Sequence, residues 1–145
     1  MFSTILLLLA LQEVGQNGVM SVDSSYFGGD RIDFAITQAD LEAAPAWIEA
    51  LYDPPLAPRQ AIRAAKGRLG ELVANANRWR VSGITLRQVM REDIWIYVVE
   101  FDAPFPDAPP GVAIAGGGPV QTIRISVLMT GSTVEPTRKP WPLTR

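Results

Sequence analysis

The stretch from Trp79 to Phe101 constrains the fold of this chain most strongly, because it is the densest run of β-branched and aromatic residues in the sequence. Two strand-like runs, 79–90 and 94–101, stand on either side of a short charged break, Arg91-Glu92-Asp93. Apolar runs of this kind around a polar corner predict a β-hairpin. The rest of the domain must therefore supply partners and covers for this hairpin.

The alternation within each strand predicts which side chains share a face. Ser82-Gly83 interrupts the first strand and is typical of a β-bulge, which would bring four apolar residues to one side: Trp79, Val81, Ile84 and Leu86. Thr85 and Arg87 would then face the other way. The second strand is apolar on both faces, with Trp95, Tyr97, Val99 and Phe101 on one and Ile94, Ile96 and Val98 on the other. A strand of this kind is usually central in its sheet and covered twice.

One amphipathic helix precedes the hairpin, and a third strand follows it. The helix is predicted over 59–77, with Pro58 in its first turn and an apolar stripe at steps of three and four residues: Ile62, Ala65, Leu69, Leu72, Val73 and Ala76. The third strand is predicted over 120–130. These elements give the expected fold class, α+β, with one main amphipathic helix packed on a three- to four-stranded antiparallel sheet.

An N-terminal segment is expected to cover the second face of this sheet. It begins with a short strand at 31–36, followed by a capping box, Thr37-Gln-Ala-Asp40, which predicts the start of a short helix. Its large apolar residues have no other apparent place to be buried: Phe34, Leu41, Trp47, Ile48 and Leu51. The domain organisation that follows is a signal peptide and lead-in over 1–20, a flexible polar stretch up to Asp30, a single α+β domain over 31–130, and a Pro-rich tail over 131–145.

The N-terminus predicts export. Met1–Leu11 is a short apolar run of the length of a signal-peptide core, too short to cross a membrane as a stable anchor. It lacks Lys or Arg before the apolar run and a clean cleavage site after it, and the alternative is an N-terminal segment of the folded core. The expected location is outside the cytoplasm, in the periplasm or cell envelope or as a secreted protein, with no membrane span after processing.

The composition excludes several kinds of chemistry. The 145-residue chain contains no Cys and no His, which rules out disulfides, thiolate nucleophiles, Cys/His zinc sites and His-based triads. A formal net charge of −2 predicts no nucleic-acid partner. No cofactor, metal or catalytic residue is predicted; an enzyme without Cys and His would use carboxylates, Lys or Ser, and carboxylates offer the only acid–base pair in this chain.

In the order of its elements, the region 57–130 resembles the small PepSY-type or cystatin-like α+β modules of exported bacterial proteins. The residues that carry the resemblance lie in the helix and in the hairpin: 59–65, Trp79-Arg-Val81, Ile84-Thr-Leu86 and 95–101. Such modules are generally non-catalytic, and some are proposed to inhibit or chaperone peptidases. The resemblance assigns no functional residue.

Five side chains are the candidate ligand or partner contacts: Trp95, Tyr97, Glu100, Asp102 and Trp141. The aromatic pair could stack on a ligand, the two carboxylates fall on one face of the strand, and Pro-Trp-Pro around Trp141 could dock to a partner. The preferred function is an exported, non-catalytic domain that binds a protein or peptide. The alternative is a small-ligand-binding domain or carboxylate-based enzyme with a pocket between helix and curved sheet, and a third is a purely structural role in an envelope assembly. A filled core behind Trp95 favours partner binding, whereas a deep pocket that holds Glu100 favours the alternative.

Overall fold

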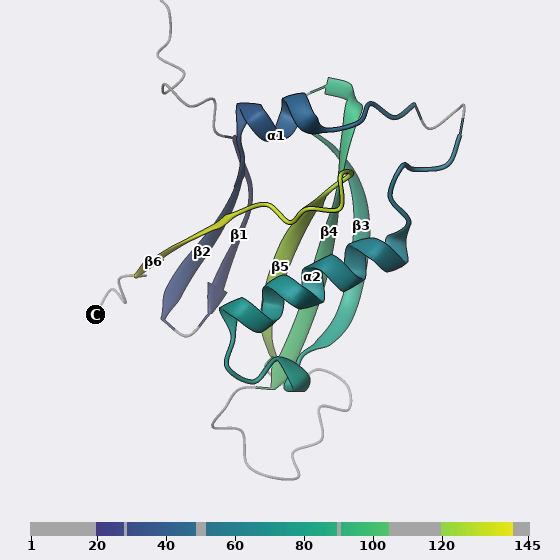
Figure 1. Cartoon of the computed structure of the whole chain (residues 1–145). Coiled ribbons are helices and arrows are strands. Elements are labelled where there is room, and N and C mark those ends of the chain that lie inside the picture. The colour runs from purple at the N-terminus through teal and green to yellow at the C-terminus, as the bar shows by residue number, and fades with distance from the viewer. Residues whose placement is uncertain (1–19, 28, 49–51, 90, 105–119, 141–145) are drawn as a thin grey trace, which may run out of the picture.

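A computed structural model describes residues 20–27, 29–48, 52–89, 91–104 and 120–140, and places them in two three-stranded antiparallel sheets with one main helix (Figure 1). The elements in chain order are β1 (Met20–Phe27), β2 (Asp30–Ile36), α1 (Gln38–Ala43), α2 (Pro58–Leu72), η1 (Ala76–Arg78), β3 (Arg80–Val89), β4 (Arg91–Pro104), β5 (Val120–Leu128) and β6 (Pro136–Pro140). The α+β class is as predicted. The single sheet is not, because the strands divide between two sheets. No helix in the described ranges is long and apolar enough to span a membrane.

The first sheet, called here the β4 sheet, contains β3, β4 and β5 in that order. A hairpin and a third strand are present as predicted, and β4 is the central strand; β4 begins at Arg91, however, so the residues predicted as the charged break belong to the strand. The pairing of β3 with β4 shifts register between Val81 and Gly83, which confirms the bulge. After the shift, Ile84 is opposite Val99 and Leu86 is opposite Tyr97, so the apolar residues of both strands share one face.

The helix α2 covers that face, and its buried side differs slightly from the predicted stripe. Ala61, Ala65 and Leu69 are buried, whereas Ile62 and Leu72 are only partly buried. The small alanines bring the helix backbone close to the sheet. The helix ends at Leu72, five residues before the predicted end, because the next residue takes an extended conformation and packs into the core.

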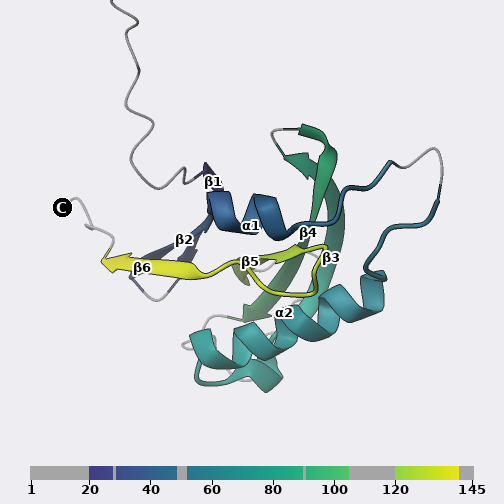
Figure 2. The ribbon, with the colours of Figure 1, turned by 45° about the horizontal axis from the view of Figure 1, so that its top comes forward.

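The second sheet, called here the β2 sheet, contains β1, β2 and β6 and lies beside β5 (Figures 1 and 2). Two predictions are wrong here: residues 20–27 form a strand instead of a flexible lead-in, and residues 136–140 form a strand instead of a tail. Packed elements thus lie on both sides of the predicted limits 31–130. The physical reason is β2 itself, whose inward side chains Ile32, Phe34 and Ile36 are fully buried, so that its two edges must be paired. Gly29, with φ of 81°, closes the turn between β1 and β2.

The predicted covering segment has the expected capping box and a buried Trp47, but Trp47 contacts Trp95, whose side chain lies on the α2 face of the sheet. Thr37 and Asp40 form the capping box at the start of α1, and Trp47 is buried, with its backbone N–H donating to the Asp93 carbonyl oxygen over 2.9 Å. This bond fixes the segment against the beginning of β4. Ile48 is 52% exposed, so its predicted burial is wrong, and Leu51 is outside the described residues. Residues 1–19 are also outside the described residues.

Both sheets and α2 contribute to one hydrophobic core. Its fully buried members include Phe34 from the β2 sheet and Phe101 and Ile125 from the β4 sheet. The connection after β5 adds Val134, whose backbone N–H donates to the carbonyl oxygen of Ser126 over 2.9 Å. The two sheets are therefore layers of a single packed unit.

Candidate functional site

The two aromatic candidates belong to the packed interior. Tyr97 is 3% exposed, and its hydroxyl donates a 2.9 Å hydrogen bond to the backbone carbonyl of Leu56, just before α2. Burial raises the pKa of the Tyr97 hydroxyl, which therefore stays protonated. Trp95 meets Trp47 edge to face, with ring centroids 5.0 Å apart and planes at 67°. Tyr97 is thus a member of the hydrophobic core, and Trp95 is partly buried against it.

The two candidate carboxylates lie on the opposite face of β4, and each has its own partner. Glu100 accepts a 2.7 Å hydrogen bond from Arg124 Nε and a 3.2 Å hydrogen bond from Ser82 Oγ. Asp102 accepts from Thr122 Oγ1 over 2.8 Å. The charged hydrogen bond from Arg124 holds the pKa of Glu100 below its usual value. The two acids therefore have separate hydrogen-bond partners, and Glu100 is held as an ionised carboxylate.

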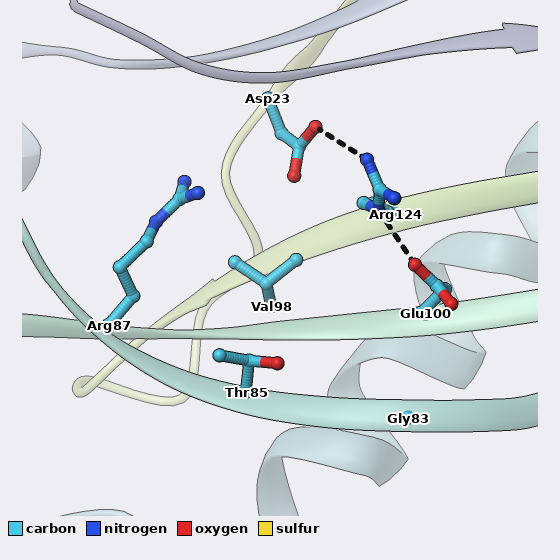
Figure 3. A pocket seen from close by; sticks show the side chains of 7 residues that line it. All are labelled: Asp23, Gly83, Thr85, Arg87, Val98, Glu100 and Arg124. Carbon is cyan, nitrogen blue, oxygen red and sulfur yellow. Dashed lines mark hydrogen bonds and ion pairs between the residues drawn. The ribbon is translucent and has the colours of Figure 1, made fainter.

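A cleft opens on this second face, between the β4 sheet and β1 (Figure 3). It has a volume of about 270 Å³ and is lined by four strands; the lining residues are Asp23, Gly83, Thr85, Arg87, Val98, Glu100 and Arg124. We call it the β1–β5 cleft. Glu100 is the one sequence candidate that it contains. The last candidate, Trp141, lies outside the described residues.

Arg124 connects the two sheets at one end of the β1–β5 cleft. Its guanidinium bonds Glu100 on β4 and lies 3.8 Å from Asp23 Oδ1 on β1, while its backbone N–H donates to Ser25 Oγ over 2.9 Å. The neighbouring carboxylates raise the pKa of Arg124, with the hydrogen bond to Glu100 as the largest cause. Asp23 is mostly buried, with a side chain only 12% exposed.

Sequence reasoning missed Asp23 and Arg124, for different reasons. Asp23 falls in a polar stretch that has no strand pattern of its own. The alternation of 120–130 predicts only that Arg124 faces outward. The strand register, which places it opposite Glu100, is the signal that could have identified it. Cross-strand pairs of opposite charge are a recurrent feature of antiparallel sheets, but the register cannot be read from one strand alone.

The outer edge of the β4 sheet is a second candidate surface. β3 is an edge strand of ten residues, and within the described ranges only β4 pairs with it. Its apolar residues Val81, Ile84 and Leu86 are partly buried on the α2 side. It carries two arginines, Arg80 and Arg87, and no acid.

The described residues contain no group of three or more acidic side chains that could hold a metal ion. Comparisons of the chain with known protein families, with curated proteins and with solved structures found no match. The PepSY-like or cystatin-like resemblance therefore stays a prediction from the order of the elements.

Proposed function

We propose that this protein is a non-catalytic binding domain that takes a polypeptide partner as an added strand along β3. The observation that carries the proposal is the open edge of β3, where ten consecutive residues end the β4 sheet without a further strand in the described part of the chain. Proteins usually protect an exposed edge strand from pairing with other chains: they keep it short, or place prolines or bulges in it. β3 contains no proline, and its register shifts lie near its beginning and at its end, so that Gly83 to Gln88 pair without interruption.

The side chains of β3 favour an extended peptide with a particular alternation. On the α2 side, Ile84 and Leu86 are only partly buried, and apolar side chains of an added strand would complete their burial. On the opposite side, Arg80 and Arg87 favour acidic residues. In this mode of recognition, backbone hydrogen bonds supply affinity, and the alternating side chains supply specificity.

The alternative of a carboxylate-based enzyme has less support. An acid catalyst needs a carboxyl group whose pKa is raised toward the working pH. The pKa of Glu100 is shifted the other way, because Arg124 stabilises its charged form. The pocket between the end of α2 and the sheet has a volume of about 230 Å³, and no carboxylate of the described residues lines it.

Site-specific crosslinking in the native host tests the proposed edge. A photoreactive amino acid placed at Ser82, exposed on β3, should capture a partner, while the same probe at Lys66, exposed on α2, should not. The captured segment, made as a synthetic peptide, should bind the purified protein in a fluorescence anisotropy titration. Leu86→Lys, which puts a charge into the apolar row, should weaken that binding by about tenfold or more.

A matched pair of charge reversals separates the edge from general electrostatics. Arg80→Glu on β3 should lower the affinity of the protein for the peptide. Arg63→Glu, the same change on the exposed side of α2, should leave that affinity unchanged. Equal capture from Ser82 and Lys66, or unchanged affinity in Leu86→Lys, contradicts the proposal. If the captured species is a second copy of this chain, the partner is not a separate peptide and the proposal is wrong in that respect.

We also propose that the protein is exported, on the basis of the apolar run Met1–Leu11. β1 begins at Met20, which pairs with Ile36, so a cleavage before Met20 leaves the β2 sheet whole. Expressed in its host, the mature protein should be found outside the cytoplasm and begin between Gln12 and Met20, as N-terminal sequencing would show. A cytoplasmic protein that retains Met1 would contradict this.

A further inference from the structure

We infer that the β1–β5 cleft binds a small zwitterion of the free amino-acid class. The cleft adjoins the proposed peptide edge and shares Arg87 with it, but it lies over the face of the sheet, whereas the edge offers backbone groups. Its volume of about 270 Å³ is near the lower end of the range for small-molecule sites, and corresponds to roughly nine water molecules of liquid. The ligand must therefore be small.

The charges around the cleft favour a ligand that carries both signs. Its walls contain two carboxylates, Asp23 and Glu100, and two guanidinium groups, Arg87 and Arg124, which balance. A ligand with one net charge would upset that balance, whereas a zwitterion preserves it. The ion pair of Arg124 with Glu100 stands on one side of Val98, and Arg87 stands on the other (Figure 3).

Asp23 is the contact expected for the ammonium group. One of its carboxylate oxygens faces Arg124, and the other points into the cleft (Figure 3). The Asp23 carboxylate is mostly shielded from water, and its ion pair with Arg124 is long, at 3.8 Å. An ammonium group in the cleft would therefore give this carboxylate a closer positive charge. Ser24 N–H also donates to Oδ1 over 2.8 Å, which fixes the carboxylate in this orientation.

The carboxylate of the ligand has donors on the opposite walls. A guanidinium carries five N–H donors in a planar fork, so each arginine of the cleft can serve more than one acceptor. Thr85 adds a hydroxyl on β3, and Val98 gives the floor an apolar contact for the Cα of an amino acid. An α-amino acid would thus find a carboxylate for its ammonium group, donors for its carboxylate and an apolar contact for its Cα.

Gly83 leaves the room for such a ligand. It lines the cleft, and a Cβ added to it would meet nothing within 4 Å, so that the missing side chain is open volume. A larger residue here would fill part of the cleft without removing any charged group, although position 83 lies opposite Glu100 in the strand pairing. Gly83 therefore offers a substitution that narrows the site and retains its four charged side chains.

The test compares two glycine replacements in the full chain. Gly83→Leu narrows the cleft; Gly67→Leu, on the exposed side of α2 with equal free space, is the matched control. The probes are L-alanine, L-serine, L-glutamate and L-lysine, with propionate and ethylammonium as analogues that carry one charge. Binding is followed by NMR shifts of the backbone amides of Gly83 and Arg124 and quantified by calorimetry.

At least one amino acid should bind the native protein and move these amides, and Gly83→Leu should raise its Kd by about tenfold or more, with no change in Gly67→Leu. Asp23→Asn should weaken the same amino acid while the thermal unfolding profile confirms the fold. The inference is overturned if no amino acid binds, if Gly83→Leu binds as well as the native protein, or if propionate or ethylammonium binds as tightly as the amino acids.

Discussion

The β4 sheet and the β2 sheet have the same number of strands and the same antiparallel pairing, but they draw on very different parts of the chain. β3 and β4 are consecutive and joined by a hairpin, and β5 is the next strand. In the β2 sheet, the central strand pairs on one side with its hairpin neighbour and on the other with β6, so that Phe34 is opposite Pro136. One sheet is mainly local in sequence, and the other joins distant segments.

The two sheets also differ in how they are held. The central strand of the β4 sheet is buried along most of its length. In β2, buried and partly exposed residues alternate, so only one face enters the core. Polar links then attach the β2 sheet to the remainder, through Arg124 to Ser25 and through Arg138 to the carbonyl oxygen of Leu72. A sheet that is buried on only one face therefore relies on polar links of this kind, in addition to its apolar contacts, to hold its position.

The strongest way to break the comparison is to remove one core phenylalanine from each sheet. Phe101 and Phe34 are both fully buried, so Phe101→Ala and Phe34→Ala should each lower the free energy of unfolding by about 3–5 kcal/mol. Urea denaturation measures both, and Ile48→Ala, at an exposed position, serves as control. A small loss in Phe34→Ala alone would mean that the β2 sheet is not part of the same cooperative core.

The helix is the next test, because α2 packs on the β4 sheet. Leu69→Ala should cost about 2–5 kcal/mol, since Leu69 is buried in the centre of the helix face. Arg63→Ala, on the exposed side, should be close to neutral. Equal losses in chemical denaturation would show that the buried face of the helix has been assigned wrongly.

A smaller effect should come from the link between β6 and the helix end. Arg138 Nη2 donates to the Leu72 carbonyl over 2.7 Å, and its side chain is about half exposed. Arg138→Ala should therefore cost about 0.5–1 kcal/mol, while Lys139→Ala, on the neighbouring exposed residue, should cost less. Hydrogen exchange sharpens the result, because the amides of β6 should lose more protection than those of β4.

The smallest expected effect is on pH dependence, and it compares one carboxylate from each sheet. The pKa of Asp33 is lowered mainly by its hydrogen bond from Ser24, and that of Glu100 mainly by its hydrogen bond from Arg124. Because each folded pKa is below the unfolded value, the added stability is present above about pH 4, near the ordinary values, and is lost as pH falls through the folded pKa.

Denaturation midpoints at neutral and acidic pH measure this effect. Asp33→Asn and Glu100→Gln should each reduce the loss of stability on acidification relative to the native protein. If Glu100→Gln loses as much stability on acidification as the native protein, the bond from Arg124 to Glu100 contributes nothing to folding.

The difference between the sheets also explains how much could be predicted from the sequence. The hairpin, its bulge and the third strand follow from alternation, and the capping box at Thr37 from a local hydrogen-bonding pattern. β1 and β6 carry no such signal: β1 has Asp23-Ser-Ser25 at its centre, and β6 is Pro-Thr-Arg-Lys-Pro. These strands exist because β2 needs partners, which is a property of the tertiary structure.

The candidate site follows the same rule. Glu100 could be predicted as a candidate because the alternation of its own strand is clear. Its role as the ion-pair partner of Arg124 depends on the strand pairing, which places the two residues opposite each other. The β1–β5 cleft was not predictable, since it lies between a strand that the sequence marks and one that it does not.

The pairing of β2 with β6 has a consequence for the order of events during synthesis. A ribosome makes β2 early, but its second neighbour, residues 136–140, arrives more than 100 residues later. Until then β2 has an open edge and its buried side chains have no finished core to enter. The chain can form its central hairpin while it is being made, yet it cannot close the molecule. We expect the nascent protein to remain open until late in translation, a state that suits passage across a membrane and that needs protection from self-association.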